Sequence, residues 1–132
     1  MRAVDTNVLV RALVRDDTVQ SPRAEALLRE GRLYVPVTVL LELEWVLRSR
    51  YGFTPRRVAQ AIQLLAALPG VTLGERDAAL AAAVRAAQGW DFADALHHAL
   101  SAGCDDFVTL DAVLARQAAR DDSLAPPVVR LR

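Results

Sequence analysis

The sequence predicts an α/β domain in which helices cover both faces of a parallel sheet. Short apolar segments alternate along the whole chain with longer stretches whose apolar residues recur at helical spacing, which is typical of parallel sheets crossed by helices. The chain has 132 residues, of which 53% are hydrophobic, so it is long enough for one core and too short for a second domain. Residues 1–132 are therefore expected to form a single domain.

Five strands and seven helices are expected, and glycine and proline residues mark several of their ends. The expected strands are residues 2–5, 32–35, 71–73, 107–110 and 128–131. The expected helices are residues 7–13, 19–30, 38–51, 55–68, 75–88, 91–102 and 112–120. Gly52 ends the third helix, and Thr54 with Pro55 forms an N-cap and first-turn proline. Ligands of such sheets bind outside the carboxyl ends of the strands, so residues that follow a strand are the first candidates for a site.

Composition and charge exclude several function classes. The 16 basic residues balance 16 acidic ones, so a strongly positive field for nonspecific nucleic-acid binding is not expected. All the basic residues are arginine, which excludes chemistry that needs a lysine, and no glycine-rich phosphate loop is present. Cys104 has no disulfide partner in the chain, and we find neither a signal peptide nor an apolar run of about 20 residues. A soluble, cytoplasmic protein is the expectation.

Asp5 and Asp111 each follow an expected strand and precede an expected helix. Two such residues at the ends of parallel strands can lie side by side, and paired carboxylates then need a cation such as Mg²⁺ to offset their repulsion. The alternative is that each is a helix N-cap, a position that favours aspartate. Both interpretations stay open for each residue taken alone.

Glu42 and Glu44 lie in the same expected helix but have different neighbours. Glu44 precedes Arg48 by four residues, so an exposed helical ion pair explains it. Glu42 has no such partner, and its neighbours one turn away are Thr38 and apolar side chains. A partly desolvated carboxylate in that setting requires a metal or hydrogen bonds, whereas a glutamate at the edge of the apolar stripe would simply reach solvent.

Asp91 and Asp94 stand three residues apart at the start of an expected helix. This spacing fits a capping box, in which the first residue caps the helix and the fourth points back toward it. It equally allows Asp91 to cap while Asp94 points into a cleft as a metal ligand. The two interpretations are compatible, and Asp94 is the better candidate for a direct ligand.

Taken in order, these segments resemble the PIN-domain ribonucleases, and among them the VapC toxins of bacterial toxin–antitoxin pairs. The resemblance rests on four segments that span nearly the whole chain. They are Asp5-Thr6-Asn7, Glu42 in Glu-Leu-Glu-Trp-Val-Leu, Asp94 in Asp-Phe-Ala-Asp-Ala-Leu, and Asp111 in Thr-Leu-Asp. The resemblance implies a three-layer α/β/α sandwich with a parallel five-stranded sheet, endonucleolytic cleavage of RNA, a Mg²⁺ or Mn²⁺ site, a cognate antitoxin and frequent homodimers.

The same resemblance assigns roles to individual residues. It makes an acidic quartet of Asp5, Glu42, Asp94 and Asp111, and we place Asp5 and Asp94 innermost around the metal. Weaker candidates support that quartet or bind RNA: Thr6, Asn7, Asp91 and Thr109 beside the acids, and Arg11 and Arg15 on the phosphates. The remaining candidates are expected to be structural or surface residues. Trp45 and Tyr51 are expected as packing or dimer residues in preference to base-stacking platforms, Cys104 in the core, and His97 and His98 on a helix surface in preference to general acids. The alternative function is a catalytically silent domain of this fold that binds RNA or a protein.

Overall fold

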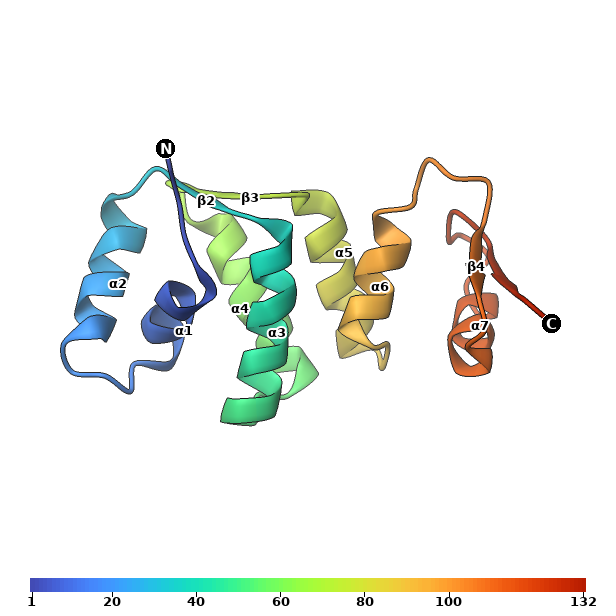
Figure 1. Ribbon diagram of the computed structural model, residues 1–132, viewed down its shortest axis with the longest axis horizontal. Helices are drawn as coiled ribbons and strands as arrows, with labels where there is room; N and C mark the ends of the chain where they lie inside the picture. Colours follow the sequence, from blue (N-terminus) through green and yellow to red (C-terminus); the bar gives the residue numbers. More distant parts are fainter.

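The computed structural model describes residues 1–132, and its elements follow the predicted order (Figure 1). The elements are β1 (Arg2–Ala3), α1 (Thr6–Val14), α2 (Gln20–Glu30), β2 (Leu33–Val35), α3 (Val37–Tyr51), α4 (Pro55–Ala67), β3 (Val71–Leu73), α5 (Arg76–Ala87), α6 (Phe92–Ala99), β4 (Phe107–Thr109), α7 (Ala112–Ala119) and β5 (Val128–Arg130). All five strands and seven helices agree with the prediction, and the largest difference is that α6 ends at Ala99 instead of residue 102. None of the helices has the length and apolar content needed to cross a membrane.

The first three strands form a parallel sheet in the order β1-β2-β3. Leu33 and Val35 of β2 are fully buried, whereas Tyr34 between them points outward, as the two-residue period of a strand requires. The turns that precede β2 and β3 pack closely, because a Cβ atom at Gly70 would lie 1.9 Å from the carbonyl oxygen of Gly31. Only glycine therefore fits at residue 70 in this arrangement.

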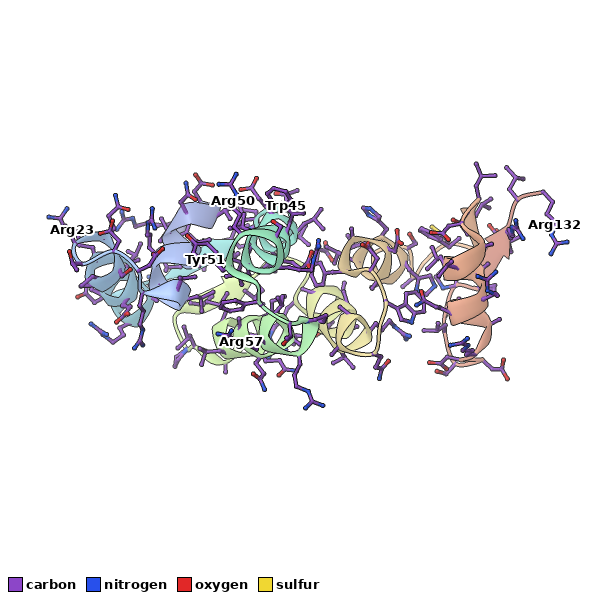
Figure 2. All side chains as sticks on the ribbon, turned by 90° about the horizontal axis from the view of Figure 1, so that it is seen from below. Arg23, Trp45, Arg50, Tyr51, Arg57 and Arg132 are labelled. Carbon is purple, nitrogen blue, oxygen red and sulfur yellow. The ribbon has the colours of Figure 1, made fainter.

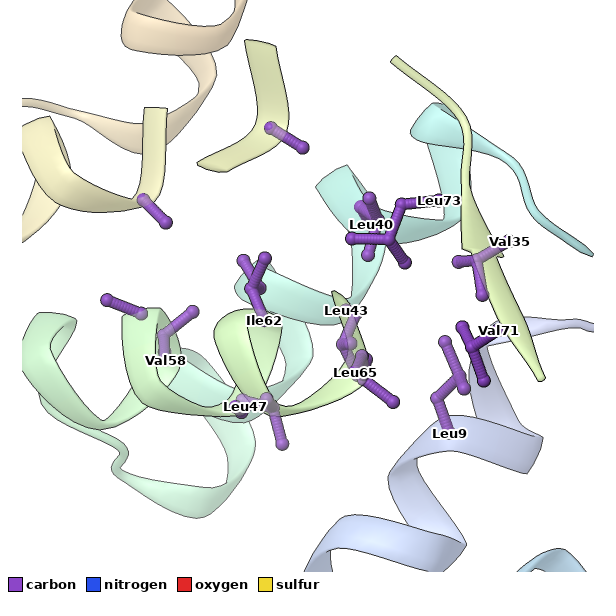
Figure 3. Close-up of a cluster of buried hydrophobic side chains, with 14 of the residues drawn as sticks. Leu9, Val35, Leu40, Leu43, Leu47, Val58, Ile62, Leu65, Val71 and Leu73 are labelled. Carbon is purple, nitrogen blue, oxygen red and sulfur yellow. The ribbon is translucent and has the colours of Figure 1, made fainter. Parts of the chain in front are cut away.

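The main core lies between this sheet and helices α1 to α6. Leu40, Leu43 and Leu47 lie on one face of α3 and are fully buried. They meet Ile62 and Leu65 of α4, as Figure 3 shows. The core continues as one cluster of 25 buried residues, the last of which in the sequence is in α6. We call residues 1–100, which contain this cluster, the N-terminal body.

The last two strands form a separate parallel pair, β4-β5, and α7 connects them. We call residues 107–132 the C-terminal unit; it lies at the far end of the molecule from β1 (Figure 1). The structure thus contains all five expected strands, each paired in parallel, but divides them between two sheets where the resemblance implied one. The edge of β1 away from β2 and the edge of β4 away from β5 carry no neighbouring strand.

The C-terminal unit contacts α5 and α6 instead of β1, and side chains make these contacts. The imidazole Nε2 of His98 lies 2.7 Å from the carbonyl oxygen of Pro126, and the His98 ring packs edge-on against Phe107. His98 is only 2% exposed, so the expected surface position for this histidine was wrong. An ion pair of 3.8 Å between Arg85 and Asp121 lies beside this contact. The position of the unit is therefore set by a few side chains and by no shared sheet.

Candidate active site and adjoining groove

Asp5 lies between β1 and α1, as predicted, and is the N-cap of α1. Its Oδ1 accepts a hydrogen bond of 2.7 Å from the Thr6 amide, and the residue is exposed. Thr6 is 3% exposed, and its hydroxyl oxygen is buried without any hydrogen-bond partner. An unpaired buried hydroxyl is rare and costs free energy, so the neighbourhood of Asp5 lacks a polar partner in this arrangement.

Asp111 occupies the equivalent position between β4 and α7. Its Oδ1 accepts hydrogen bonds from the amides of Val113 and Leu114 at 2.8 and 3.1 Å, so it caps α7. The Thr109 hydroxyl in turn accepts a hydrogen bond from the Asp111 amide at 3.0 Å. Thr109 therefore fixes the backbone of Asp111, while the second carboxylate oxygen of Asp111 takes no part in the cap.

Asp91 and Asp94 lie together at the start of α6, and Asp91 is its N-cap. Asp91 Oδ1 accepts a hydrogen bond of 2.9 Å from the Asp94 amide. Partial burial raises the pKa of the Asp94 carboxyl above its ordinary value, and the nearby carboxylates of Asp91 and Asp111 raise it further, while His97 lowers it. Asp94 is thus a half-buried acid among other acids, and the carboxylate would be stabilised by a cation.

The exposures of Glu42 and Glu44 in α3 are the reverse of those expected. Glu44 is only 8% exposed, and its carboxylate binds Arg48 Nε at 2.7 Å. The hydrogen bond to Glu44 raises the pKa of the Arg48 guanidinium, and the charges of Glu44 and Asp91 raise it further. Glu42 is exposed. The pairing of Glu44 with Arg48 was predicted correctly, but the exposure of Glu44 was not, because the tertiary structure buries this position of α3.

Arg48 was predicted as the partner of Glu44, but its position near Asp91 was not predicted. The charge of Asp91, at the N-terminus of α6, also raises the pKa of Arg48, although the two side chains form no ion pair. The i to i+4 spacing predicted Glu44 as its partner, but only the tertiary arrangement shows that Asp91 lies near enough to act on its charge.

A groove of about 520 Å³ lies between α1 and α3, and Glu42 lines it. The lining residues are Asn7, Val10, Arg11, Glu42, Trp45, Val46, Arg50 and Tyr51. Asn7, expected beside the acids, and Arg11, expected on the RNA phosphates, both line this groove. Arg15 does not: its guanidinium instead binds Glu25 of α2 at 2.8 Å. Trp45 and Cys104 are exposed, so the core position expected for Cys104 was wrong.

The candidate acids therefore form two groups. Asp91, Asp94 and Asp111 influence one another at the N-termini of α6 and α7. Asp5 and Glu42 belong to α1 and α3 in the N-terminal body. No three side chains among histidine, cysteine, aspartate and glutamate lie close enough together to hold one metal ion in this arrangement.

Residues 2–120 match the family model of the PIN domain, and these residues contain all four acids of the predicted quartet. The chain belongs to the PIN domain family. PIN domains are typically nucleases. The PIN match ends before β5, the last strand of the C-terminal unit. No curated protein matches the sequence at a significant level.

Proposed function

We propose that this PIN domain is a metal-dependent endoribonuclease that hydrolyses RNA phosphodiester bonds. The observation that carries the proposal is the environment of Asp94, a half-buried carboxylate whose pKa is raised by burial and by Asp91 and Asp111. No hydrogen bond to the Asp94 side chain offsets this cost. Acids that destabilise each other in this way are characteristic of functional sites and are relieved by a bound cation.

The donor set fits a hard divalent cation. Asp94 and Asp111 offer carboxylate oxygens, the ligands that Mg²⁺ prefers, and the one thiol of the chain, that of Cys104, is not among the candidate ligands. Asp5 and Asp94 would lie innermost around the metal, as direct ligands or through water, and Glu42 and Asp111 would complete the site. When bound, Mg²⁺ or Mn²⁺ neutralises charge on the phosphate and supplies an activated water. The chain's own acids hold this ion and orient the water.

The complete quartet requires the C-terminal unit to align β4 beside β1. The amides of Arg2 and Val4 donate to β2, so the Ala3 amide points to the open edge of β1. Phe107 likewise donates to the β5 side, so the Val108 amide points to the open edge of β4. Pairing of these two edges would join the five strands into one sheet and place Asp111 beside Asp5, near the unpaired Thr6 hydroxyl.

Hydrogen exchange measures this alignment directly. We expect the Ala3 and Val108 amides to become protected when Mg²⁺ or Mn²⁺ is added, because both would then donate within one sheet. The Phe107 amide is the internal control, since it is already bound to Pro127 at 2.9 Å. If the Ala3 and Val108 amides exchange at unprotected rates both with and without metal, the two sheets stay separate.

The catalytic test is cleavage of total cellular RNA by the purified protein with Mg²⁺ or Mn²⁺, with EDTA as the metal-free control. Discrete fragments are expected from the wild type, and Asp94→Asn and Asp5→Asn should lose at least about a hundredfold in rate, because each removes a carboxylate from the site. Asp77→Asn is the matched control: Asp77 lies fully exposed on α5, and its loss should leave cleavage unchanged.

The outcomes of this assay separate the candidate functions. Cleavage that needs the metal, Asp5 and Asp94 supports the endoribonuclease. Cleavage that persists in Asp94→Asn shows that the site is wrong. Intact RNA under every condition, together with RNA binding, supports the alternative of a catalytically silent module.

We further propose that the protein is the toxin of a toxin–antitoxin pair in the cytoplasm, restrained by a cognate antitoxin and active as a homodimer. This role rests on the resemblance of the four acidic segments to VapC toxins. Induced expression in a bacterial host should arrest growth, whereas equal expression of Asp94→Asn should not. Growth arrest by both proteins would exclude RNA cleavage as its cause.

A further inference from the structure

Trp45 is a large aromatic residue at the surface beside a predicted catalytic acid. It is 50% exposed, which does not fit the expected packing role and leaves the expected dimer contact untested. Trp45 and Glu42 are three residues apart on α3 and line the same groove against α1. An exposed tryptophan in a polar groove is unusual, because burial of its ring elsewhere would stabilise the fold. The position therefore suggests a binding role.

The positive charge in the groove comes from Arg11 and Arg50, which have different partners. Arg11 of α1 is already bound, with its guanidinium 3.1 Å from Asp16 and 2.9 Å from Gln20. Arg50 makes no ion pair with any acid. Its guanidinium instead lies over the Trp45 ring at 5.9 Å from the ring centroid, and both side chains project from the same side of α3 (Figure 2). An unpaired cation beside an exposed indole is suited to a phosphate and a base.

We propose that Trp45 and Arg50 form a subsite for a single-stranded segment of the RNA that adjoins the cleaved bond. An unpaired base stacks on the exposed part of the Trp45 ring, and Arg50 binds a neighbouring phosphate. A base within a duplex cannot stack in this way, because its faces are already covered. The subsite rests on the proposed function, and it places the substrate along the groove between α1 and α3, with Glu42 in its wall.

The test uses the fluorescence of Trp45. Trp90 is the only other tryptophan, so a Trp90→Phe variant leaves Trp45 as the sole emitter. The probe is a short oligouridylate, titrated at low salt in EDTA so that no metal-dependent cleavage occurs. We expect saturable quenching by the single strand and much weaker quenching by a blunt RNA duplex of equal length. Trp45→Ala, followed by anisotropy of labelled oligouridylate, should weaken binding about 5- to 100-fold.

The chain offers a matched control for Arg50. Arg57 lies over the Phe53 ring at 4.0 Å from its centroid, in the same type of contact, but on the opposite side of the molecule from Trp45 and outside the groove (Figure 2). Arg50→Gln should lower the slope of log affinity against log salt by about 0.7, the value for one phosphate of a single strand. Arg57→Gln should leave the slope unchanged.

Each outcome decides the proposal. Equal losses in Arg50→Gln and Arg57→Gln, equal quenching by duplex and single strand, or no quenching at all would each overturn the subsite. Trp45 emission that depends on protein concentration and not on RNA would also overturn it, because a second copy of the chain would then cover the ring. Metal-dependent cleavage without quenching would support the proposed nuclease and contradict the subsite. Quenching without any cleavage would support the RNA subsite and contradict the proposed nuclease.

Discussion

The N-terminal body and the C-terminal unit are built from similar elements but differ in how they are held together. The body contains the whole cluster of 25 buried residues. The C-terminal unit buries only Leu114, Ala118 and Pro126, and leaves Val108, Leu110 and Val129 exposed. Both regions pair their strands in parallel, yet only the body surrounds its sheet with several helices. Stability is therefore concentrated in the body.

The predicted acids of the site are divided between the two regions. Asp5, Glu42 and Asp94 lie in the body, whereas Asp111 lies in the weakly packed unit. The proposed site thus needs a residue from the region with the fewest buried contacts. Regions of low local stability are those that move most easily in folded proteins. Four substitutions, taken in decreasing order of their expected effect, test this difference between the two regions.

Leu43→Ala should have the largest effect, because Leu43 of α3 is fully buried in the core, on the side of α3 that faces α4. We expect a loss of about 2–5 kcal/mol in the free energy of unfolding, from the lost transfer energy and the cavity left behind. Urea unfolding followed by circular dichroism measures it. Leu64→Ala is the matched control on the exposed face of α4 and should change stability by less than about 0.5 kcal/mol. Equal losses in both variants would show that the core is misplaced.

Gly70→Ala should follow in size. The added Cβ would meet backbone atoms of Gly31, which cannot rotate away as a side chain could, so the β2–β3 pairing must shift. An overpacking cost of about 1–3 kcal/mol is expected in the same unfolding experiment. Gly103→Ala changes the same residue type between the two regions, where no atom lies within 4 Å of the added Cβ, and should be nearly neutral. A neutral Gly70→Ala would contradict the close approach of the two turns.

His98→Ala should act on one region alone. It removes the hydrogen-bond partner of the Pro126 carbonyl and the aromatic contact with Phe107, for which we expect about 1–3 kcal/mol. Amides of α7 and β5 should exchange faster with solvent, while those of α4 should not change. His97→Ala, one residue earlier and exposed, is the control. Faster exchange throughout the body would mean that the two regions unfold together.

Asp121 should give the smallest effect, and it should depend on pH. The hydrogen bonds from the Ser123 hydroxyl and amide, with a further contribution from Arg85, lower the pKa of the Asp121 carboxyl below its ordinary value of 3.8. Its folded pKa lies below its unfolded pKa, so it contributes stability above that ordinary value and loses it as the pH falls through the folded pKa. Below about pH 4 the exchange of the C-terminal unit should rise in the wild type. Asp121→Asn should flatten this dependence.

Sequence patterns predicted the elements well because those patterns are local. Thr54 and Pro55 begin α4, and Gly52 follows α3 in the left-handed conformation with φ +68°, as the residue types indicate. The arrangement of the two sheets was not predictable in this way. It depends on contacts between residues far apart in the sequence, such as His98 with Pro126, for which no spacing rule exists.

The site was predictable only in part for the same reason. Helix capping by Asp5, Asp91 and Asp111 followed from their positions before helices. The burial of Glu44 did not, because periodicity along α3 cannot reveal which faces of the helix the tertiary structure covers. Nor could it show that Trp45, in a strongly apolar segment, would remain at the surface.

The segment between α6 and β4 connects the two regions, and it carries Cys104, the only cysteine of the chain, in an exposed position. A maleimide dye or nitroxide would therefore attach at this single point of the natural sequence, with no cysteine to remove first. Its rotational freedom would report how the C-terminal unit turns relative to α6, in real time and in the presence of RNA.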